Sequence, residues 1–153
     1  MDPDTSLVAA SLFPDEQPWD VVFDAFHVTH GQFWLVAGDG AEIVSAVPEG
    51  DSLKGNGAAI GIPASRSATR VSVALSFWEE PAHDGCGALV GRCRIAVPDR
   101  ELALVNVEGR EPGPVLLLPD GGEYEVTVRR LEAEDAVAPE RYEIRVWPCA
   151  APR

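Results

Sequence analysis

Apolar and polar residues alternate along several short stretches of the chain, and the clearest alternation lies in residues 115–128. An apolar run opens this stretch, and the sequence Pro-Asp-Gly-Gly separates it from a segment in which every second side chain is apolar. A period of two buries one face of a β-strand, and Asp-Gly-Gly supplies the positive φ angles of a tight reversal. The pattern predicts a β-hairpin whose second strand buries Tyr124, Val126 and Val128.

Two further stretches show the same period, residues 69–78 and residues 141–147. In the first, apolar side chains at every second position alternate with polar or small ones, which predicts a core-facing side made of Val71, Val73, Leu75 and Phe77. The second predicts a strand with Tyr142, Ile144 and Val146 pointing inward and with Arg141, Glu143 and Arg145 pointing to solvent.

Further apolar stretches lie at residues 21–30, 32–36, 88–97 and 101–107. A His-Gly turn separates the first two, which predicts another hairpin. Thirteen prolines and fourteen glycines are scattered along the chain, as is typical of many short elements joined by turns. These segments predict an all-β protein, an antiparallel β-sandwich of about seven to nine strands. A small β-barrel is the alternative that the pattern leaves open.

The chain has 153 residues, of which 46% are apolar, and this is enough for one domain with its own hydrophobic core. We expect a flexible N-terminal arm at residues 1–18, a single β-sandwich domain at residues 19–148 and a C-terminal tail at residues 149–153. The arm is rich in proline and acidic residues, which favours a loose segment over a packed element.

The arm has no basic region and no unbroken apolar segment, so it does not resemble a secretory signal. No stretch of the sequence approaches the length of a membrane span. The three cysteines, Cys86, Cys93 and Cys149, are odd in number, which argues against a disulfide framework and agrees with a reducing compartment. We therefore expect a cytoplasmic protein that does not engage a membrane.

Acidic residues outnumber basic ones by 25 to 12, which gives a formal net charge of −13 at pH 7. Binding of nucleic acid depends on Lys and Arg that neutralise phosphates, so this charge argues against direct contact with DNA or RNA. A negative field speeds association with a basic protein surface, and enzymes that act on nucleic acids have such surfaces. The alternative is that the charge serves solubility alone.

Motifs that would carry chemistry are weak in this sequence. No serine lies in a Gly-x-Ser-x-Gly context, so we predict a protein that is not an enzyme. His27 and His30, like His83 and Cys86, are three positions apart, but the paired Cys-x-x-Cys or His-x-x-x-His units of a structural zinc site are missing. We therefore predict no metal and no cofactor. A hydrolase that uses His83, Asp84 and Cys86 is the catalytic alternative.

Four tryptophans are further candidates for binding residues. Exposed aromatic side chains on a β-sandwich can stack on sugars or anchor a protein partner. Trp78 lies on the polar side of its strand beside Glu79 and Glu80, so we expect it at an interface, whereas we expect Trp34 in the core. A ligand- or carbohydrate-binding module that uses exposed tryptophans is therefore the alternative function.

An acidic segment connects the last two predicted strands. A sandwich displays its loops at its ends, where a rigid scaffold presents them to a partner, and an acidic loop can block a basic active-site groove. We therefore predict a partner-binding surface that combines this connector with the turn at Asp120 and the segment after residue 77. Its residues are Glu132, Glu134, Asp135, Glu140, Asp120, Trp78, Glu79 and Glu80.

The order of these segments resembles that of the competence protein J family, inhibitors of a DNA-entry nuclease. The resemblance spans residues 20–148 and is carried by the segments HGQFWLV, ATRVSVALSFWEEP, RIAVPDRELALVNVEG, LLLPDGGEYEVTV and ERYEIRVW. It implies a mostly β, non-catalytic inhibitor that binds a nuclease and protects DNA from it. The arm and the glycine-rich segment near residue 55 have no counterpart in the family pattern, so the expected partner is a basic nuclease or a toxin.

Overall fold

The computed structural model describes most of the predicted domain. The described residues are 20–37, 46–48, 50–65, 68–83, 85, 87–106, 115–132 and 140–149, and of Glu132 only the backbone is described. The predicted arm at residues 1–18 lies outside these ranges, as does the predicted tail beyond Cys149. The division into arm, domain and tail therefore stays a prediction.

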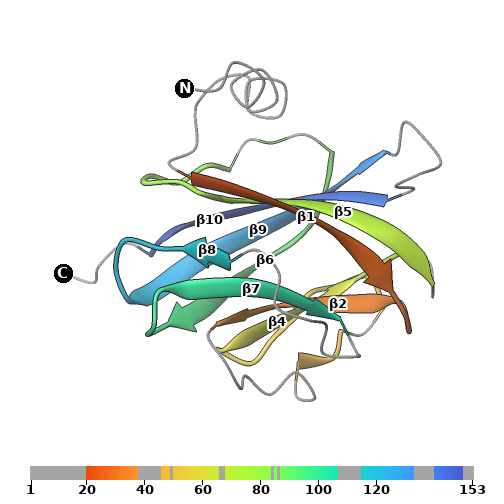
Figure 1. Ribbon diagram of the computed structural model, residues 1–153, viewed down its shortest axis with the longest axis horizontal. Helices are drawn as coiled ribbons and strands as arrows, with labels where there is room; N and C mark the ends of the chain where they lie inside the picture. Colours follow the sequence, from red (N-terminus) through yellow and green to blue (C-terminus); the bar gives the residue numbers. More distant parts are fainter. Residues whose placement is uncertain are drawn as a thin grey trace.

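Ten strands of the described residues form two five-stranded sheets (Figure 1). Sheet A has the order β1 (Asp20–Val28), β5 (Thr69–Phe77), β10 (Glu140–Pro148), β9 (Gly122–Glu132) and β6 (Ala88–Val97). Sheet B has the order β3 (Lys54–Gly55), β4 (Ala59–Pro63), β2 (Gln32–Ala37), β7 (Glu101–Asn106) and β8 (Val115–Leu117).

All neighbouring strands are antiparallel except β5 and β10, which run parallel. No ladder of the described strands joins sheet A to sheet B. The predicted antiparallel sandwich is therefore confirmed, and the barrel alternative is not adopted. The prediction of seven to nine strands falls short of ten because β3 is only two residues long and lies in the glycine-rich segment near residue 55.

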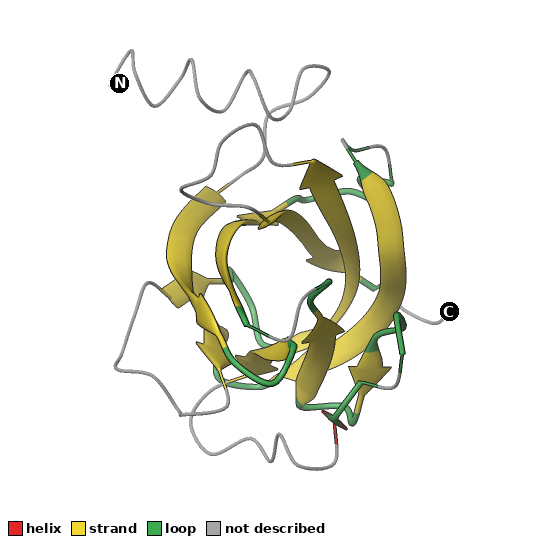
Figure 2. Ribbon diagram, turned by 90° about the vertical axis from the view of Figure 1, so that its right-hand side faces the viewer, coloured by secondary structure: helices red, strands yellow, loops and turns green. Residues whose placement is uncertain are grey.

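The main core lies between the two sheets, which face each other in Figure 2. Every side chain that the alternation placed inward on β5, β9 and β10 is buried. Sheet B supplies the opposite wall, where the ring of Phe33 meets the ring of Tyr142 edge to face at 5.1 Å. The period-two pattern therefore identified the inner face of sheet A. The sheet B core residues are Phe33, Leu35, Ile60, Ile62, Leu102, Leu104 and Leu116.

Both predicted hairpins are wrong, because the strands on either side of each turn belong to different sheets. β8 pairs with β7 in sheet B, whereas β9 pairs with β10 and β6 in sheet A. In the same way, β1 pairs with β5, whereas β2 pairs with β4 and β7. Alternation specifies which side chains face the core, but it does not specify which strand the backbone bonds to. These turns are corners that lead the chain from one sheet to the other.

Candidate partner-binding surface

The described residues of the predicted partner-binding surface divide between the two ends of sheet A, whereas Glu134 and Asp135 lie outside the described residues. β9 has eleven residues, so its ends lie roughly 33 Å apart at about 3.3 Å per residue. Asp120 precedes the first end of β9, whereas Glu132 lies at the other end and pairs in register with Glu140. Glu79 and Glu80 belong to the Asp120 end. The chain leaves β5 beside Val146, near the end of β10, and this end of β10 pairs with the start of β9. The structure therefore separates the two groups.

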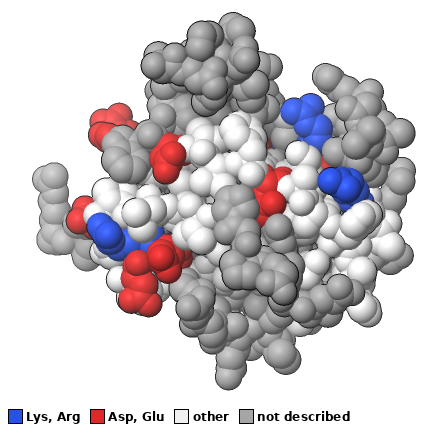
Figure 3. Space-filling view, in the orientation of Figure 1, with Lys and Arg blue, Asp and Glu red and all other residues white. Residues whose placement is uncertain are grey.

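Carboxylates gather at the end of the sandwich where β1 and β9 begin. Seven of the eight exposed acidic side chains in the described residues belong to this end, and the eighth is Asp51. In Figure 3, most of the red atoms lie over the left half of the face shown. Exposed Arg94 and Arg100 are the basic side chains nearby. We call this surface the acidic end, and its residues are Asp20, Glu79, Glu80, Asp99, Glu101, Asp120 and Glu123.

Two corner turns form the base of the acidic end, one at residues 98–100 and one at residues 118–121. The backbone N–H of Leu118 donates to the carbonyl of Arg100 at 2.7 Å, and the Arg100 side chain donates to the Pro119 carbonyl at 3.3 Å. A Cβ at Gly121 would lie 2.6 Å from the Pro98 carbonyl oxygen, so this close approach requires glycine. The two turns therefore hold each other, and the carboxylates beside them sit on fixed backbone.

Tyr124 fixes the Asp120 turn to the core. Its hydroxyl donates to the backbone carbonyl of Asp120, and its ring packs edge to face on Phe77 at 6.1 Å. Burial raises the pKa of Tyr124, and the hydrogen bond to Asp120 opposes that rise only in part. A tyrosine hydroxyl that bonds to backbone a few residues upstream is a device that sandwiches use at their corners.

Replacing Tyr124 with phenylalanine is expected to lower the free energy of unfolding by about 1 kcal/mol, because one partly buried hydrogen bond to the Asp120 carbonyl is lost. Urea denaturation of the wild-type protein and the variant measures the difference. An unchanged unfolding midpoint would show that this hydroxyl does not hold the turn.

The loop from β5 to β6 crosses the outer face of sheet A, and we call its described residues 79–83, 85 and 87 the strap. Arg129 of β9 donates to the His83 carbonyl at 2.9 Å and to the Gly87 carbonyl at 3.2 Å. Arg145 of β10 donates to the Ala82 carbonyl at 3.4 Å. Two arginines of the sheet therefore hold the strap by its backbone, and Glu79 and Glu80 lie at its start.

A charged pair lies buried beneath the strap. Glu143 and Arg145 are 1% and 6% exposed, and their side chains meet at 2.5 Å. The guanidinium of Arg145 also lies 4.4 Å from the centre of the Trp78 ring. The prediction that Glu143 and Arg145 point to solvent is wrong, because the strap covers the outer face of β10 that they occupy.

The predicted exposure of Trp78 is also wrong, since this side chain is only 3% exposed. Trp78 does lie on the outer face, as its strand pattern indicated, but it packs with Trp147 of β10 and with Ala82 of the strap. Its indole N–H donates to the Ser76 hydroxyl at 2.9 Å. Trp34 is buried as predicted, at 2% exposure. Trp19 lies outside the described residues, so none of the described tryptophans offers the exposed ring that a carbohydrate-binding module requires.

Glu140, which we expected in the partner-binding surface, is only 4% exposed. Its carboxylate accepts hydrogen bonds from the Tyr142 hydroxyl at 2.6 Å and from the Ser65 backbone N–H at 2.9 Å. Burial by itself would raise the pKa of Glu140, but these hydrogen bonds and the charge of Arg130 outweigh it and lower the pKa. Glu140 therefore anchors β10 internally and presents no carboxylate to a partner.

Replacing Glu140 with glutamine is expected to reduce the acid sensitivity of the fold. The folded pKa lies below the ordinary value of 4.5, so the wild-type carboxylate stabilises the protein above pH 4.5 and loses this contribution as the pH falls through the folded pKa. Glutamine cannot titrate, so stability should fall less steeply from about pH 5 to about pH 3. Urea denaturation at several pH values measures this, and identical pH dependence in both proteins would contradict it.

The residues of the catalytic and metal alternatives lie apart or outside the described ranges. His83 is exposed on the strap, and its ring meets Trp147 edge to face at 5.0 Å. Asp84 and Cys86 lie outside the described residues, so the hydrolase alternative stays a prediction. Within the described residues, no group of three or more His, Cys, Asp and Glu side chains is placed to hold a metal ion. Cys93 and Cys149 are free thiols.

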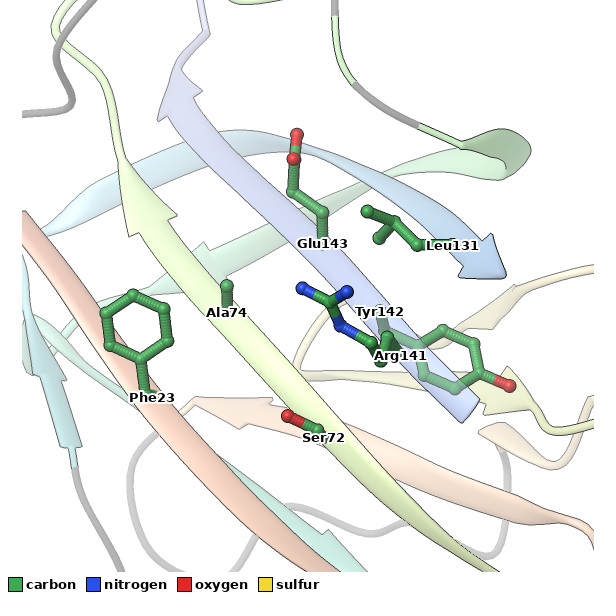
Figure 4. A pocket seen from close by; sticks show the side chains of 7 residues that line it. All are labelled: Phe23, Ser72, Ala74, Leu131, Arg141, Tyr142 and Glu143. Atoms are coloured by element: carbon green, nitrogen blue, oxygen red, sulfur yellow. The ribbon is translucent and has the colours of Figure 1, made fainter. Parts of the chain in front are cut away.

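A shallow hollow on the outer face of sheet A has a volume of about 40 Å³ (Figure 4). Phe23 of β1 and Leu131 of β9 flank it, with Arg141 of β10 between them. Sites for small molecules typically measure about 300–1,000 Å³, so this hollow is too small to indicate a ligand. In the described part of the chain, no helix is long and apolar enough to cross a membrane.

The predicted partner-binding residues did not include four residues of the acidic end, namely Asp20, Asp99, Glu101 and Glu123. Asp20, Glu101 and Glu123 lie at the start of a strand, and Asp99 lies in a corner turn, whereas Glu79 and Glu80 follow the end of a strand. The available signal was the recurrence of an acidic residue at strand ends. It identifies a common surface only when the sheet order is known.

These features define a class of fold, a two-sheet sandwich whose sheet A contains one parallel pair of strands between antiparallel ones. Two solved structures share this fold. The crystal structure of ComJ, inhibitor of the DNA-degrading activity of NucA from Bacillus subtilis, matches with a TM-score of 0.63 and 13% identity, over 87% of this chain and 98% of that one. A protein described as crocagin biosynthetic gene J matches with a TM-score of 0.60 and 12% identity, over 86% and 98% of the two chains.

The chain therefore has a ComJ-like fold, which confirms the resemblance at the level of fold. No protein-family model matches the chain, and no curated protein matches its sequence. The two similar structures carry descriptions of different kinds, an inhibitor and a biosynthetic gene product. At 12–13% identity the likeness shows the fold, and a shared fold alone does not fix a function.

Proposed function

We propose that this protein binds and inhibits a basic partner enzyme, a nuclease, through its acidic end. The observation that carries the proposal is the gathering of seven exposed carboxylates at one end of a rigid sandwich. Nucleases need Lys and Arg side chains to hold phosphates, so their substrate grooves are basic. A fixed acidic surface complements such a groove and keeps DNA out of it.

The backbone supports this role. Asp99 and Asp120 lie in corner turns that hydrogen-bond to each other. Glu79 and Glu80 begin the strap, which Arg129 and Arg145 hold by its backbone. Carboxylates on fixed backbone lose little conformational entropy on binding, which favours a tight complex. Inhibition by occupation of the groove requires no reactive group in the inhibitor, so the proposed protein is non-catalytic.

We propose that the protein acts in the cytoplasm and that it binds neither nucleic acid nor membranes. A nuclease that endangers the cell's own DNA is met in the cytoplasm, which is where we place the protein. The acidic end would repel nucleic acid and anionic lipid, so neither is a partner. Glu132 at the opposite end of sheet A, together with Glu134 and Asp135, which lie outside the described residues, remains a proposed second contact.

A retention experiment tests the proposal. The full chain is immobilised, exposed to a lysate of its native cells at low salt and washed, and the fraction released by high salt is assayed for degradation of DNA. We expect a DNA-degrading activity in that fraction, and we expect excess free protein to suppress it. A released fraction that does not degrade DNA would contradict the proposal. A column carrying the variant with lysine at Glu79, Glu80 and Asp120 is the control for charge.

A further inference from the structure

We propose that Val115 and Leu117 of β8 form the apolar centre of the nuclease-binding surface. This inference rests on the proposed function and adds to it the part of the surface that contacts the partner most closely. Protein interfaces place apolar side chains at the centre and charged ones around the rim, and a few central side chains carry most of the binding energy. The acidic end supplies a rim, and β8 lies directly beside it.

β8 exposes one of its faces to solvent. Val115 and Leu117 are 45% and 49% exposed, whereas Leu116 between them is fully buried in the core. The two exposed side chains are two positions apart on one strand, so they share its outer face. Single exposed apolar residues are common on proteins, but neighbouring ones on one face form a patch.

The register of β7 and β8 extends this patch. Ala103 pairs with Val115, and Glu101 pairs with Leu117, so these side chains lie directly opposite one another on the outer face of sheet B. Ala103 is half-buried and packs against the cluster that contains Trp34. An apolar strip of Ala103, Val115 and Leu117 therefore runs to a carboxylate of the acidic end.

Charge decides which partner fits the strip. Glu101 lies beside Leu117, and the corner turns that flank β7 and β8 carry Asp99 and Asp120. A second copy of this chain would bring a second set of the same carboxylates into the interface, and like charges close together cost free energy. A basic partner would place its Lys and Arg side chains against the same carboxylates. The strip therefore fits the proposed nuclease better than it fits another copy.

The test uses Leu117 and a matched leucine. Leu89 of β6 is 46% exposed and pairs with Arg129 toward the far end of β9, so it has similar exposure at a different place. We expect Leu117→Ala to weaken binding of the nuclease released from the immobilised chain by about tenfold, as for a central interface residue, and Leu89→Ala to leave it unchanged. Surface plasmon resonance with that nuclease measures both, and thermal unfolding confirms that both variants are folded.

A charged variant separates the strip from the charge around it. Leu117→Glu adds a negative charge to the acidic end, so it would strengthen binding if charge alone attracted the nuclease. If the strip is the apolar centre of the interface, we expect Leu117→Glu to bind the nuclease more weakly, because a carboxylate would occupy that centre.

Three results would overturn the inference, and they are distinguishable from failure of the proposed function. If the nuclease is retained and binds Leu117→Ala with unchanged affinity, the strip is not part of the interface but the proposed function stands. Stronger binding by Leu117→Glu would do the same. A wild-type dimer in sedimentation that Leu117→Ala converts to monomer would assign the strip to self-association. If the wild-type chain retains no nuclease, the proposed function fails first and the strip fails with it.

Discussion

Lysine at Glu79, Glu80 and Asp120 is expected to slow association with the nuclease by about 10- to 100-fold at low ionic strength. These three carboxylates are exposed at one end of the sandwich, and each reversal changes the charge by two units, so the net charge moves from −13 to −7. Steering depends on the local field, which added salt screens over about 10 Å at 0.1 M. Stopped-flow association rates over a range of salt concentrations measure the effect.

The matched control is a pair of single variants. Glu79→Lys and Asp51→Lys change the net charge equally, but Asp51 is the one exposed acid of the described residues that lies away from the acidic end. We expect slower association for Glu79→Lys and little change for Asp51→Lys. Equal slowing by both would show that total charge steers the encounter, and the acidic end would then have no special role.

The same experiment tests the opposite end of sheet A. Reversal of Glu132, Glu134 and Asp135 also adds six units of charge, but at the connector between β9 and β10. The proposal predicts a smaller effect there than at Glu79, Glu80 and Asp120. A larger effect at the connector would move the interface to that end.

Replacing Glu143 with leucine is expected to lower the free energy of unfolding by about 3–5 kcal/mol. The substitution leaves the Arg145 guanidinium buried without this carboxylate, and desolvation of that charge is costly. A domain of this kind is stable by about 5–15 kcal/mol, so the loss is a large fraction of the total. Urea denaturation measures the change.

Two comparisons isolate the buried pair. Arg94→Met breaks the exposed pair of Arg94 and Glu125, whose side chains are 68% and 36% exposed, and should cost less than about 1 kcal/mol. The double variant Glu143→Leu, Arg145→Met removes both buried charges and should be more stable than Glu143→Leu alone. A loss at Glu143→Leu no larger than at Arg94→Met would show that the pair does not hold the outer face of sheet A.

The sequence predicted faces of strands better than it predicted their neighbours. Val71, Tyr142 and the other alternating apolar residues are buried as expected, because burial of one face is a local property of a strand. The turn at Pro119 was expected to close a hairpin, but it leads from sheet B to sheet A. Pairing depends on contacts between residues far apart in the chain, which a local pattern does not contain.

The alternation of apolar and polar residues also could not predict which side chains on the outer face of sheet A are buried. Trp78, Glu143 and Arg145 lie on the predicted face of their strands, but the strap covers that face. A loop that folds back over a sheet leaves no periodic signal in the strands beneath it. Glu140 shows the same limit, since its partners Ser65 and Tyr142 reach it only in the folded sheet.

The acidic end could be found only in part from the sequence. Asp120 was identified from its turn, and Glu79 and Glu80 were identified as neighbours of Trp78, whereas Asp99 joins them through the packing of two corner turns. The apolar strip on β8 was hidden for the opposite reason. Leu117 belongs to an unbroken apolar run, and only pairing with β7 shows which of its residues face solvent.

Inhibition itself is the most direct test of the proposed function. The nuclease retained by the immobilised chain is purified, and its rate of DNA degradation is measured as wild-type protein is added. The account predicts that degradation stops near one equivalent of protein and that the Glu79, Glu80 and Asp120 lysine variant requires a large excess. Degradation that continues at saturating wild-type protein would contradict it.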